Sequence, residues 1–352
     1  MDLNNLILLL ILVSLGFYFN KYFILTLKKN YPKLLIDDQL KKPQAFHESP
    51  IPTTGGVVIF FLFLVVCLDL FITKKIFFFE YISFCTLFFL LGFADDLKTN
   101  IKPKVRLFLM FIFLIMLIKY NNFYINNTGI EVLNKWITSS EIFSLILVCL
   151  CFLFIINGAN LIDGYNGLLG IHSLIIFINL FFVNFNSGAN NLAIFLFFMI
   201  VILLTFLLFN FPNAKIFLGD GGSYLLGSFI AVSTIMTSIE NPDVSPFYFC
   251  IILFYLFFEV FFSFFRKLIK KQSPLYPDTK HLHMLLYKTL LKKNKDKLKS
   301  NFSVSIIINT IYFTLTIPAI LMMKDGLFCK YYSMVFFIVY AFSYKLINQK
   351  IK

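Results

Sequence analysis

Long apolar runs alternate with short polar segments along the whole 352-residue chain. Most runs reach about 18 residues, enough for a helix to cross the ~30 Å hydrocarbon core of a bilayer. The pattern predicts an all-α, polytopic integral membrane protein with about eleven transmembrane helices. The predicted spans are residues 5–27, 53–73, 76–94, 104–119, 140–158, 167–184, 191–210, 222–240, 246–265, 302–323 and 326–344.

Composition agrees with this pattern, because 59% of the residues are hydrophobic and only 14% are charged. No stretch is long and polar enough for a separate soluble domain, so we expect one transmembrane domain over 1–352. Its longest polar segment, 266–301, is expected to be a basic cytoplasmic loop. The first apolar run, Leu6 to Leu27, has no basic segment before it and is expected to remain as a span.

Lysine and arginine are unevenly divided between the two sets of alternate loops. Of 31 basic residues, 24 lie in the set that begins with 28–52 and 5 lie in the opposite set. Basic loops stay on the cytoplasmic side, so we expect the N-terminus outside and the C-terminus in the cytoplasm. The net charge of +13 therefore follows from topology, and we expect no nucleic-acid partner.

The most unusual polar stretch is 157–170, NGANLIDGYNGLLG, which lies between two apolar runs. At helical pitch Asn157, Asn160 and Asp163 fall on one face, and Asn166 follows closely. A glycine-rich turn between two helices is one interpretation. The other is a polar site at the membrane surface, where side-chain oxygens converge on a cation or a phosphate.

Acidic residues stand at the ends of two further spans. Asp95 and Asp96 directly follow the third run, and Asp220 lies among glycines in GDGGS at 219–223. A carboxylate pair suits a divalent cation or a general base, because Mg²⁺ takes one or two carboxylates together with phosphate oxygens and waters. The plainer alternatives are a solvated loop for the pair and an ordinary helix cap for Asp220.

Basic and histidine residues suggest contacts with anions. Pro103 opens a helix whose first turn contains Lys104 and Arg106, where cations are unfavourable unless an anion binds there. For Arg106, simple positive-inside charge is an equal alternative. His281 and His283 lie in the long basic loop without a third histidine or a cysteine nearby, so they favour a nucleotide over zinc, with ordinary loop histidines as the alternative.

Two acids fall within predicted spans. Asp69 lies near the outer end of its span, and the role of Glu259 is left open. A secondary transporter would place polar sites near the bilayer centre at an internal repeat. Here the polar segments lie at span ends on one predicted side, without a visible repeat. The paired DG…G…D…D pattern of CDP-alcohol phosphotransferases is also absent from the sequence.

Together these segments resemble the polyprenyl-phosphate N-acetylhexosamine-1-phosphate transferase family. The family includes GlcNAc-1-phosphate transferases that initiate O-antigen and teichoic-acid synthesis, and phospho-MurNAc-pentapeptide translocase. Asn166 replaces a second aspartate common in the family, and Met284 stands where a further histidine is common. The chain looks nearer to the GlcNAc-transferase branch, with the translocase as the alternative. The matching segments are PTTGG at 52–56, GFADD at 92–96, PKVR at 103–106, NGANLIDGYNGL at 157–168, FPNAKIFLGDGGS at 211–223 and HLH at 281–283.

The resemblance implies an enzyme of the bacterial cytoplasmic membrane whose active site faces the cytosol. It would transfer a sugar-1-phosphate from a UDP-N-acetylhexosamine to undecaprenyl phosphate and release UMP. It would use Mg²⁺, with Mn²⁺ as the alternative ion, and homo-oligomerisation is left open. The implied catalytic residues are Asp95, Asp96 and Asp163, the implied metal ligands are Asp220 and Asp95, and the implied substrate-binding residues are Gly55, Gly56, Lys104, Arg106, Asn157, Asn160, Asn166, His281 and His283.

Overall fold

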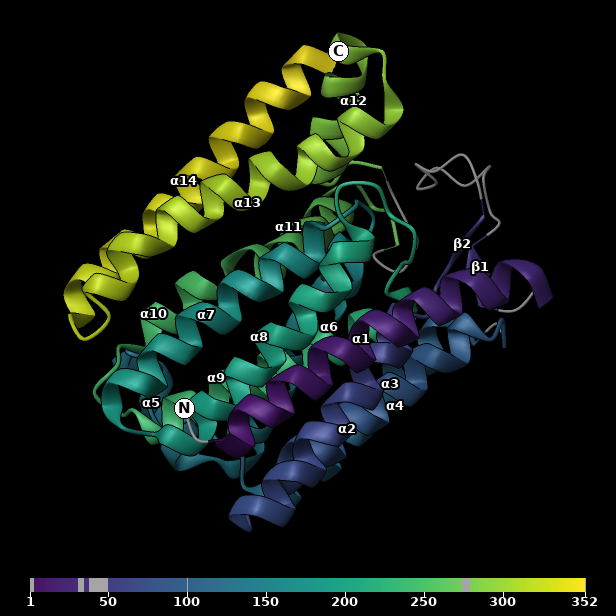
Figure 1. The fold of residues 1–352 in the computed structure, drawn as a ribbon. Helices are drawn as coiled ribbons and strands as arrows, with labels where there is room; N and C mark the ends of the chain where they lie inside the picture. The colour runs from purple at the N-terminus through teal and green to yellow at the C-terminus, as the bar shows by residue number, and fades with distance from the viewer. Residues whose placement is uncertain (1–2, 31–34, 38–49, 100, 274–278, 352) are drawn as a thin grey trace.

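The computed structural model describes residues 3–30, 35–37, 50–99, 101–273 and 279–351 (Figure 1). Within these residues nearly all secondary structure is helical, as expected. The helices are α1 (Leu3–Asn30), α2 (Gly55–Lys74), α3 (Phe79–Asp96), α4 (Pro103–Asn121), α5 (Glu131–Ser139), α6 (Glu141–Ile162), α7 (Leu168–Ser187), α8 (Asn190–Asn210), α9 (Gly219–Glu240), α10 (Pro246–Ile252), α11 (Phe254–Ile269), α12 (Leu282–Asn294), α13 (Lys297–Leu321) and α14 (Gly326–Ile351).

A short antiparallel strand pair precedes α2. β1 (Ile36–Asp37) pairs with β2 (Ile51–Pro52), so that Ile36 lies opposite Pro52. The carbonyl of Pro52 also accepts a hydrogen bond of 2.8 Å from the backbone N–H of Phe217. This bond ties the segment before α2 to the segment before α9.

Eight helices in the described part of the chain are long and apolar enough to cross a membrane: α1, α2, α6, α7, α8, α9, α13 and α14. α3 and α4 occupy the predicted spans 76–94 and 104–119, but charged residues in their terminal turns keep them outside this group. A polytopic helical membrane protein is confirmed, and the count of eleven crossings stays a prediction.

The predicted single span 246–265 is wrong in form. The chain breaks there at Leu253 into α10 and α11, which are bent by 75° relative to each other. Both halves are apolar, so hydrophobicity alone did not reveal the break. α11 then crosses α6 so closely that a Cβ on Gly158 would overlap the backbone of Leu256. A glycine at 158 is therefore required by the packing of the bent segment.

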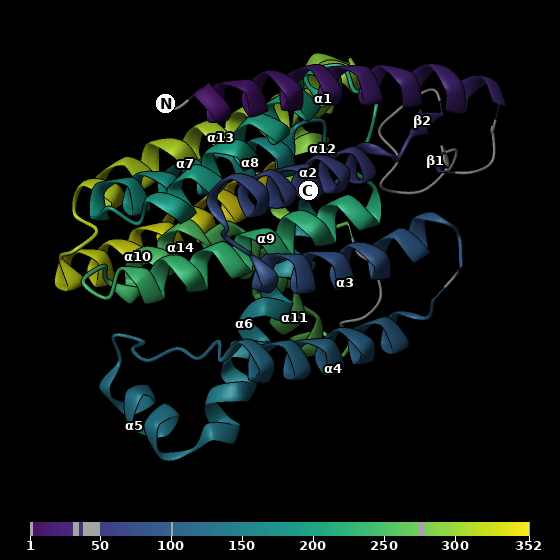
Figure 2. The ribbon, with the colours of Figure 1, turned by 60° about the horizontal axis from the view of Figure 1, so that its bottom comes forward.

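Two helices lie in segments that we expected to be loops. α5 lies between α4 and α6, and Figure 2 shows it set apart from the main bundle. It exposes Val132 and Trp136 on one side and buries Ile137. α12 lies within the basic loop 266–301 and buries its first turns. Both helices are too short for a span, so a pattern of long apolar runs does not predict them.

The centre of the bundle is α9, which packs against α2, α3, α6 and α7 (Figure 2). Small residues let neighbouring helices approach it closely: Gly222 lies against Gly56 of α2, and Gly227 lies against Ile156 of α6. The hydroxyl of Tyr81 donates a hydrogen bond of 3.0 Å to Ser233 within this core. α9 therefore brings its own N-terminal turn to the ends of three other helices.

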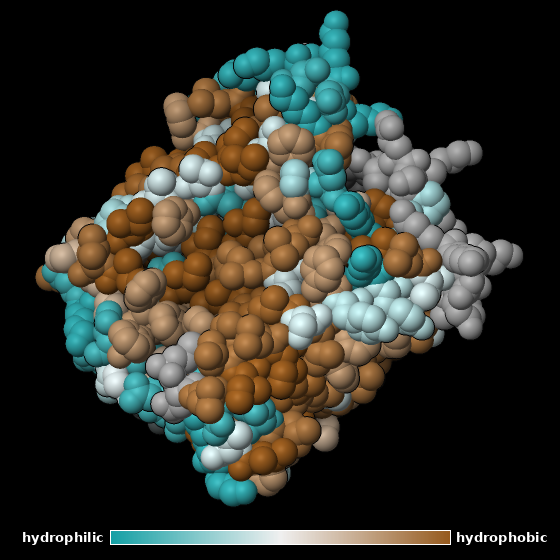
Figure 3. Space-filling view, in the orientation of Figure 1, coloured by the Kyte–Doolittle hydropathy of each residue, from teal (hydrophilic) through white to brown (hydrophobic). Residues whose placement is uncertain are grey.

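Alternate loops gather at two opposite ends of the bundle. α1 begins at the end where α5 lies, and α14 ends near α12 at the other end (Figure 1). Figure 3 shows an apolar band across this face, with hydrophilic residues at both ends. Large exposed side chains such as Leu10, Phe108 and Leu208 contribute to the apolar surface of these helices. This surface suits contact with lipid chains.

The orientation of the bundle can be tested with reporter fusions. We expect a reporter fused after Lys352 to be active in the cytoplasm and one inserted near Asn241 to be active outside, because the basic loops lie at the same end of the bundle as the C-terminus. Enzymatic reporters that work on only one side of the membrane would measure this. Activity of both fusions on the same side would contradict the predicted orientation.

Candidate active site

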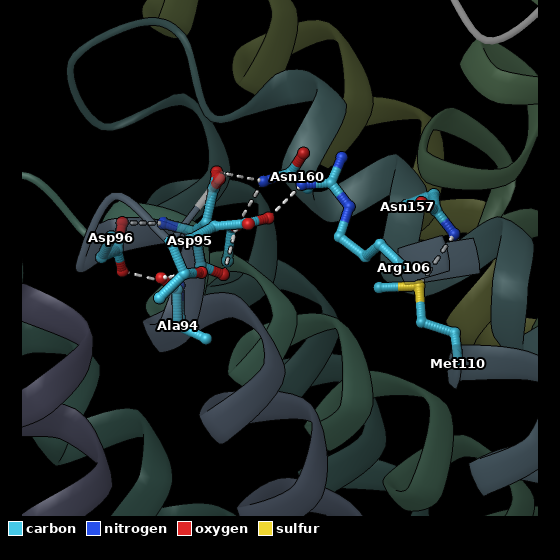
Figure 4. A network of polar contacts seen from close by, with 11 residues as sticks. Ala94, Asp95, Asp96, Arg106, Met110, Asn157 and Asn160 are labelled. Carbon is cyan, nitrogen blue, oxygen red and sulfur yellow. Dashed lines mark hydrogen bonds and ion pairs between the residues drawn. The ribbon is translucent and has the colours of Figure 1, made fainter. Parts of the chain in front are cut away.

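Four helix ends meet at the end of the bundle that carries the basic loops. They are the C-terminal ends of α3 and α6 and the N-terminal ends of α4 and α9. Figure 4 shows Asp95 of α3 next to Asn160 of α6 and on the side of Arg106 of α4, while Asp96 lies on the opposite side of the cluster. The segments are far apart in sequence, yet their polar side chains form one connected cluster.

Asp96 binds the N-terminal turn of α9. Its two carboxylate oxygens accept hydrogen bonds from the backbone N–H groups of Asp220, at 2.8 Å, and Gly221, at 2.9 Å. The first N–H groups of a helix have no partner within it, and the positive end of the helix dipole attracts a carboxylate. Burial raises the pKa of Asp96 to about 7 despite these two bonds, and the charge of Asp220 raises it further.

Two glycines make this contact sterically feasible. Gly219 has a positive φ of 76°, and a Cβ there would lie 2.6 Å from Oδ2 of Asp96. On the other side, a Cβ on Gly92 would overlap the backbone carbonyl of Asp220. Larger residues at either position would push α3 and α9 apart. The glycines in GFADD and GDGGS are therefore explained by the close approach of these two helix ends.

Asn160 links α6 to the same turn. Its side-chain amide donates hydrogen bonds to Oδ1 of Asp220, at 2.8 Å, and to the hydroxyl of Ser223, at 2.9 Å. Asp163 follows at the C-terminal end of α6. Burial raises the pKa of Asp163 well above its ordinary value, and the negative charges of Asp220 and Asp96 raise it further. Three of the four predicted acids thus repel one another, as expected of side chains that share a cation.

The fourth acid, Asp95, forms an ion pair with Arg106 at the start of α4. The guanidinium of Arg106 also lies 5.7 Å from the ring centre of Tyr224, which is fully buried on α9. Lys104 is exposed in the same helical turn. The structure therefore places one cation beside the acids and a second one accessible nearby. Whether either binds substrate stays a prediction.

Asn157 and Asn166 are turned to other partners. The amide of Asn157 donates to the carbonyl of Leu153, at 2.8 Å, and lies against Met110, away from the acids (Figure 4). The amide of Asn166 donates to the carbonyl of Pro212, also at 2.8 Å. Both contacts hold neighbouring segments in place. Their predicted substrate contacts are not tested by these positions.

Gly55 and Gly56 reach the site only through the backbone. Their N–H groups donate to the carbonyls of Phe217, at 2.9 Å, and Leu218, at 3.0 Å, and both glycines are buried. These bonds position the segment that leads into Gly219. The two glycines thus support the turn of α9 in this structure, and direct contact with substrate stays a prediction.

The two predicted histidines lie at the start of α12 and are buried. Nδ1 of His281 is 3.0 Å from Oε2 of Glu259 on α11. The ring of His283 lies edge-on to Tyr165, 5.7 Å between centres, in the turn between α6 and α7. The histidines therefore reach the turn that follows Asp163. Their role toward a nucleotide is untested.

Some residues of the cluster were not singled out from the sequence. Tyr224 directly follows GDGGS, so its position next to a motif was a usable indication. Asn301 accepts a hydrogen bond of 2.8 Å from the backbone N–H of Asn166, across 135 residues of sequence. No local pattern indicates such a contact, because it depends on how α13 packs against the turn.

The cluster fits a cation that is bound together with phosphate. In the described part of the chain, no three His, Cys, Asp or Glu side chains are grouped so as to hold a metal alone. Mg²⁺ needs fewer protein ligands, because it keeps waters and takes oxygens from substrate phosphates. Asp96 contacts the backbone of Asp220, and the two carboxylates are close enough to repel each other. The residues present therefore suit Mg²⁺ and a phosphorylated substrate.

Comparison with known proteins is consistent with this cluster. A glycosyl transferase family 4 model matches residues 78–238, which include Asp95, Asp96, Asp163 and Asp220. A phospho-N-acetylmuramoyl-pentapeptide-transferase of Dictyoglomus turgidum is 36% identical over 203 residues, 55% of this chain and 62% of the relative. This chain thus spans less than two thirds of that relative's length.

Two further relatives carry another name, undecaprenyl-phosphate alpha-N-acetylglucosaminyl 1-phosphate transferase. The one from Thermotoga maritima is 30% identical over 251 residues, covering 70% of this chain and 73% of the relative. The one from Escherichia coli K12 is 26% identical over 249 residues, 68% and 66% of the two chains. The chain belongs to glycosyl transferase family 4, the family that contains these two groups of transferases.

Proposed function

We propose that this protein transfers an N-acetylhexosamine-1-phosphate from a UDP-sugar to undecaprenyl phosphate. A phosphate oxygen of the lipid would form a bond to the phosphorus that carries the sugar. The bond between that phosphorus and the oxygen of the uridine phosphate would break. The products would be undecaprenyl-diphosphate-sugar and UMP, at the first membrane step of a cell-envelope glycan pathway such as O-antigen or teichoic-acid synthesis.

The observation that carries this proposal is the carboxylate cluster of Asp96, Asp163 and Asp220 at the ends of three helices. Phosphoryl transfer between two anions needs charge neutralisation and in-line positioning more than covalent help. A cluster of acids at the ends of spans also suits a reaction between a water-soluble nucleotide and a lipid phosphate. The names of the relatives support part of this: both groups are named for the transfer of a phosphorylated N-acetyl sugar, and one group is also named for undecaprenyl phosphate.

Each group has a proposed task. Asp220 and one of Asp95 or Asp96 would hold Mg²⁺, which when bound neutralises the charge of the diphosphate. Arg106 and Lys104 at the start of α4 would bind phosphate oxygens. The raised pKa of Asp163 shows that its negative charge is destabilised in the fold. Asp163 would either accept a proton or make a second carboxylate contact with the cation. Asn160 orients the carboxylate of Asp220.

A second candidate is transfer of phospho-N-acetylmuramoyl-pentapeptide. The relative from Dictyoglomus turgidum, which carries this name, is 36% identical, a higher value than for the relative from Thermotoga maritima. The two candidates share the lipid acceptor and the chemistry and differ in the sugar. Purified protein incubated with undecaprenyl phosphate and a panel of UDP-sugars would distinguish them. Absence of UMP release with every sugar would contradict the proposed function.

We expect the activity to require a divalent cation. Excess chelator should abolish UMP release, and added Mg²⁺ should restore it, because the paired carboxylates and the diphosphate repel each other without a cation. Mn²⁺ is expected to substitute in part. Release of UMP can be followed by chromatography. Full activity in chelator would contradict the metal role of Asp220 while leaving the transfer itself in place.

A further inference from the structure

Glu259 is a buried carboxylate that the proposed chemistry does not use. It lies on α11, beyond the bend at Leu253, with 1% of its surface exposed. An ionised group buried to this extent is costly unless it is paired and hydrogen-bonded. Its partners in the structure therefore indicate what it does.

Its two oxygens hold the beginning of α12. Oε2 lies 3.0 Å from Nδ1 of His281, and Oε1 accepts a hydrogen bond of 3.1 Å from the backbone N–H of Leu282. Leu282 is the first residue of α12, so Glu259 caps this helix from a neighbouring one. The same carboxylate thus fixes both the backbone at the start of α12 and the imidazole just before it.

The second histidine is fixed by the same group of residues. Nδ1 of His283 lies 3.2 Å from the hydroxyl of Tyr255 and 3.9 Å from Oε1 of Glu259. The rings of His281 and His283 are stacked, with 5.5 Å between centres and 6° between planes. Burial lowers the pKa of His283 to about 4, so this histidine is neutral at physiological pH. His281 is therefore the histidine that Glu259 engages most directly.

α12 also touches the turn that follows the acid cluster. The ring of Tyr165 lies 5.7 Å from the ring of His283 and 5.5 Å from that of Tyr287. Tyr165 is two residues beyond Asp163. The start of α12 is therefore held between Glu259 on one side and this turn on the other. A shift of His281 would displace the start of α12 and with it the turn that follows Asp163.

The carboxylate has a chemical advantage over an amide at position 259. A carboxylate only accepts hydrogen bonds, so the Nδ1 of His281 opposite it carries the proton. A glutamine could still accept from Leu282 with its oxygen, but its NH₂ group would face Nδ1. The imidazole would then have to change its tautomer or move.

We propose that Glu259 is a positioning residue that fixes the orientation and tautomer of His281, so that His281 can bind the nucleotide end of the UDP-sugar. This inference rests on the proposed function and assigns a cause to part of its substrate binding. Glu259 itself contacts no substrate in this scheme. It acts through an imidazole 22 positions further along the chain.

The test is a double-mutant cycle on the purified enzyme. Glu259→Gln is expected to raise KM for the UDP-sugar about tenfold, because a charge-assisted hydrogen bond to the histidine is lost. KM for undecaprenyl phosphate should change less than about twofold, since the lipid binds elsewhere. In a His281→Gln background the Glu259→Gln effect should shrink to less than about twofold, because the two residues act as one unit.

Arg266→Gln is the matched control. Arg266 lies on the same helix and donates to the backbone carbonyl of Lys280, next to His281, and to the hydroxyls of Tyr344 and Ser263. Any effect of Arg266→Gln should therefore keep its size in the His281→Gln background. Recovery from membranes and thermal stability in detergent are compared for all variants. If Glu259→Gln is not recovered, Glu259→Asp, which keeps the charge on a shorter side chain, enters the cycle in its place.

The outcomes separate the two proposals. No UMP release by the wild-type enzyme would contradict the proposed function itself. A wild-type enzyme that is active, with a Glu259→Gln effect that is equal in both backgrounds, would overturn the positioning role. An equal rise in KM for both substrates would also overturn it, because general loss of structure affects both. A selective effect on the UDP-sugar that disappears without His281 would support it.

Discussion

Replacing Asp220 by asparagine should lower turnover by a factor of about 10² or more, because transition-state charge stabilisation is lost. The amide has nearly the same shape as the carboxylate, and its oxygen can still accept the hydrogen bond from Asn160. The backbone bond from residue 220 to Asp96 is unaffected by the change. The variant should therefore insert and fold normally while losing the charge that holds a cation.

Asp243→Asn is the matched control for this substitution. Asp243 lies in the short segment between α9 and α10, is exposed and pairs with Lys324. The same chemical change there should leave turnover within about twofold of wild type. Asp243 lies outside the acid cluster, and exposed ion pairs contribute little to the free energy of unfolding. Rates are measured as UMP release at saturating UDP-sugar and Mg²⁺. Near-wild-type turnover of Asp220→Asn would contradict the metal role of Asp220 and would mean that GDGGS only starts a helix.

Much of the fold was predictable because a bilayer imposes a length on apolar segments. A helix lies at each predicted span, and α1, α2, α6, α7, α8 and α9 follow the expected order. The bend at Leu253 was not predictable, because both sides of it are apolar. α5 and α12 were missed for the opposite reason, since neither is long enough to give a membrane signal.

The acidic part of the site was predictable, because aspartates at the boundary of a membrane span have few structural roles. Asp95, Asp96, Asp163 and Asp220 stood out as acids beside apolar runs, and the structure brings them to adjoining helix ends. The contact between Asp96 and the backbone at the start of α9 was not predicted. A sequence shows which side chain is present, but a carboxylate can bind a cation, a cation-bearing side chain or a helix end with the same atoms.

The asparagines show this limit from the other direction. Asn157, Asn160 and Asn166 look alike in sequence, within ten positions of one another. Only Asn160 points at an acid, while the amides of the other two bind backbone carbonyls. An amide can donate to a carboxylate or to a backbone carbonyl, so packing decides which acceptor it meets. The helical face of Asn157 is set by where α4 lies.

Replacing Asp96 by asparagine is expected to cost even more than the change at Asp220. Its two oxygens accept from the N–H groups of Asp220 and Gly221. An asparagine has one acceptor oxygen, so its NH₂ group would face one of these donors. The variant should lose the charge and also loosen the turn of α9. We expect turnover to fall by about 10² or more and thermal stability in detergent to fall as well.

The pH dependence of the wild-type enzyme provides a direct check of the same residue. The pKa of Asp96 is raised in the folded state to about 7, so the fold favours its protonated form. Between the unfolded pKa and 7 the folded protein binds more protons than the unfolded chain. Without Mg²⁺, the Asp96 contribution to stability should therefore be fully present at low pH and be lost as pH rises through about 7.

Mg²⁺ should reverse this trend, because it binds the ionised carboxylates and not the protonated ones. The stabilisation by Mg²⁺ should be small at pH 5.5 and large at pH 8, and at limiting Mg²⁺ activity should fall as pH drops below about 7, because the proton on Asp96 competes with the cation. Melting temperatures in detergent at the two pH values, with and without Mg²⁺, measure this. Asp69→Asn, near the C-terminal end of α2, should behave like wild type. Stabilisation by Mg²⁺ that is equal at both pH values would show that Asp96 does not control the cation.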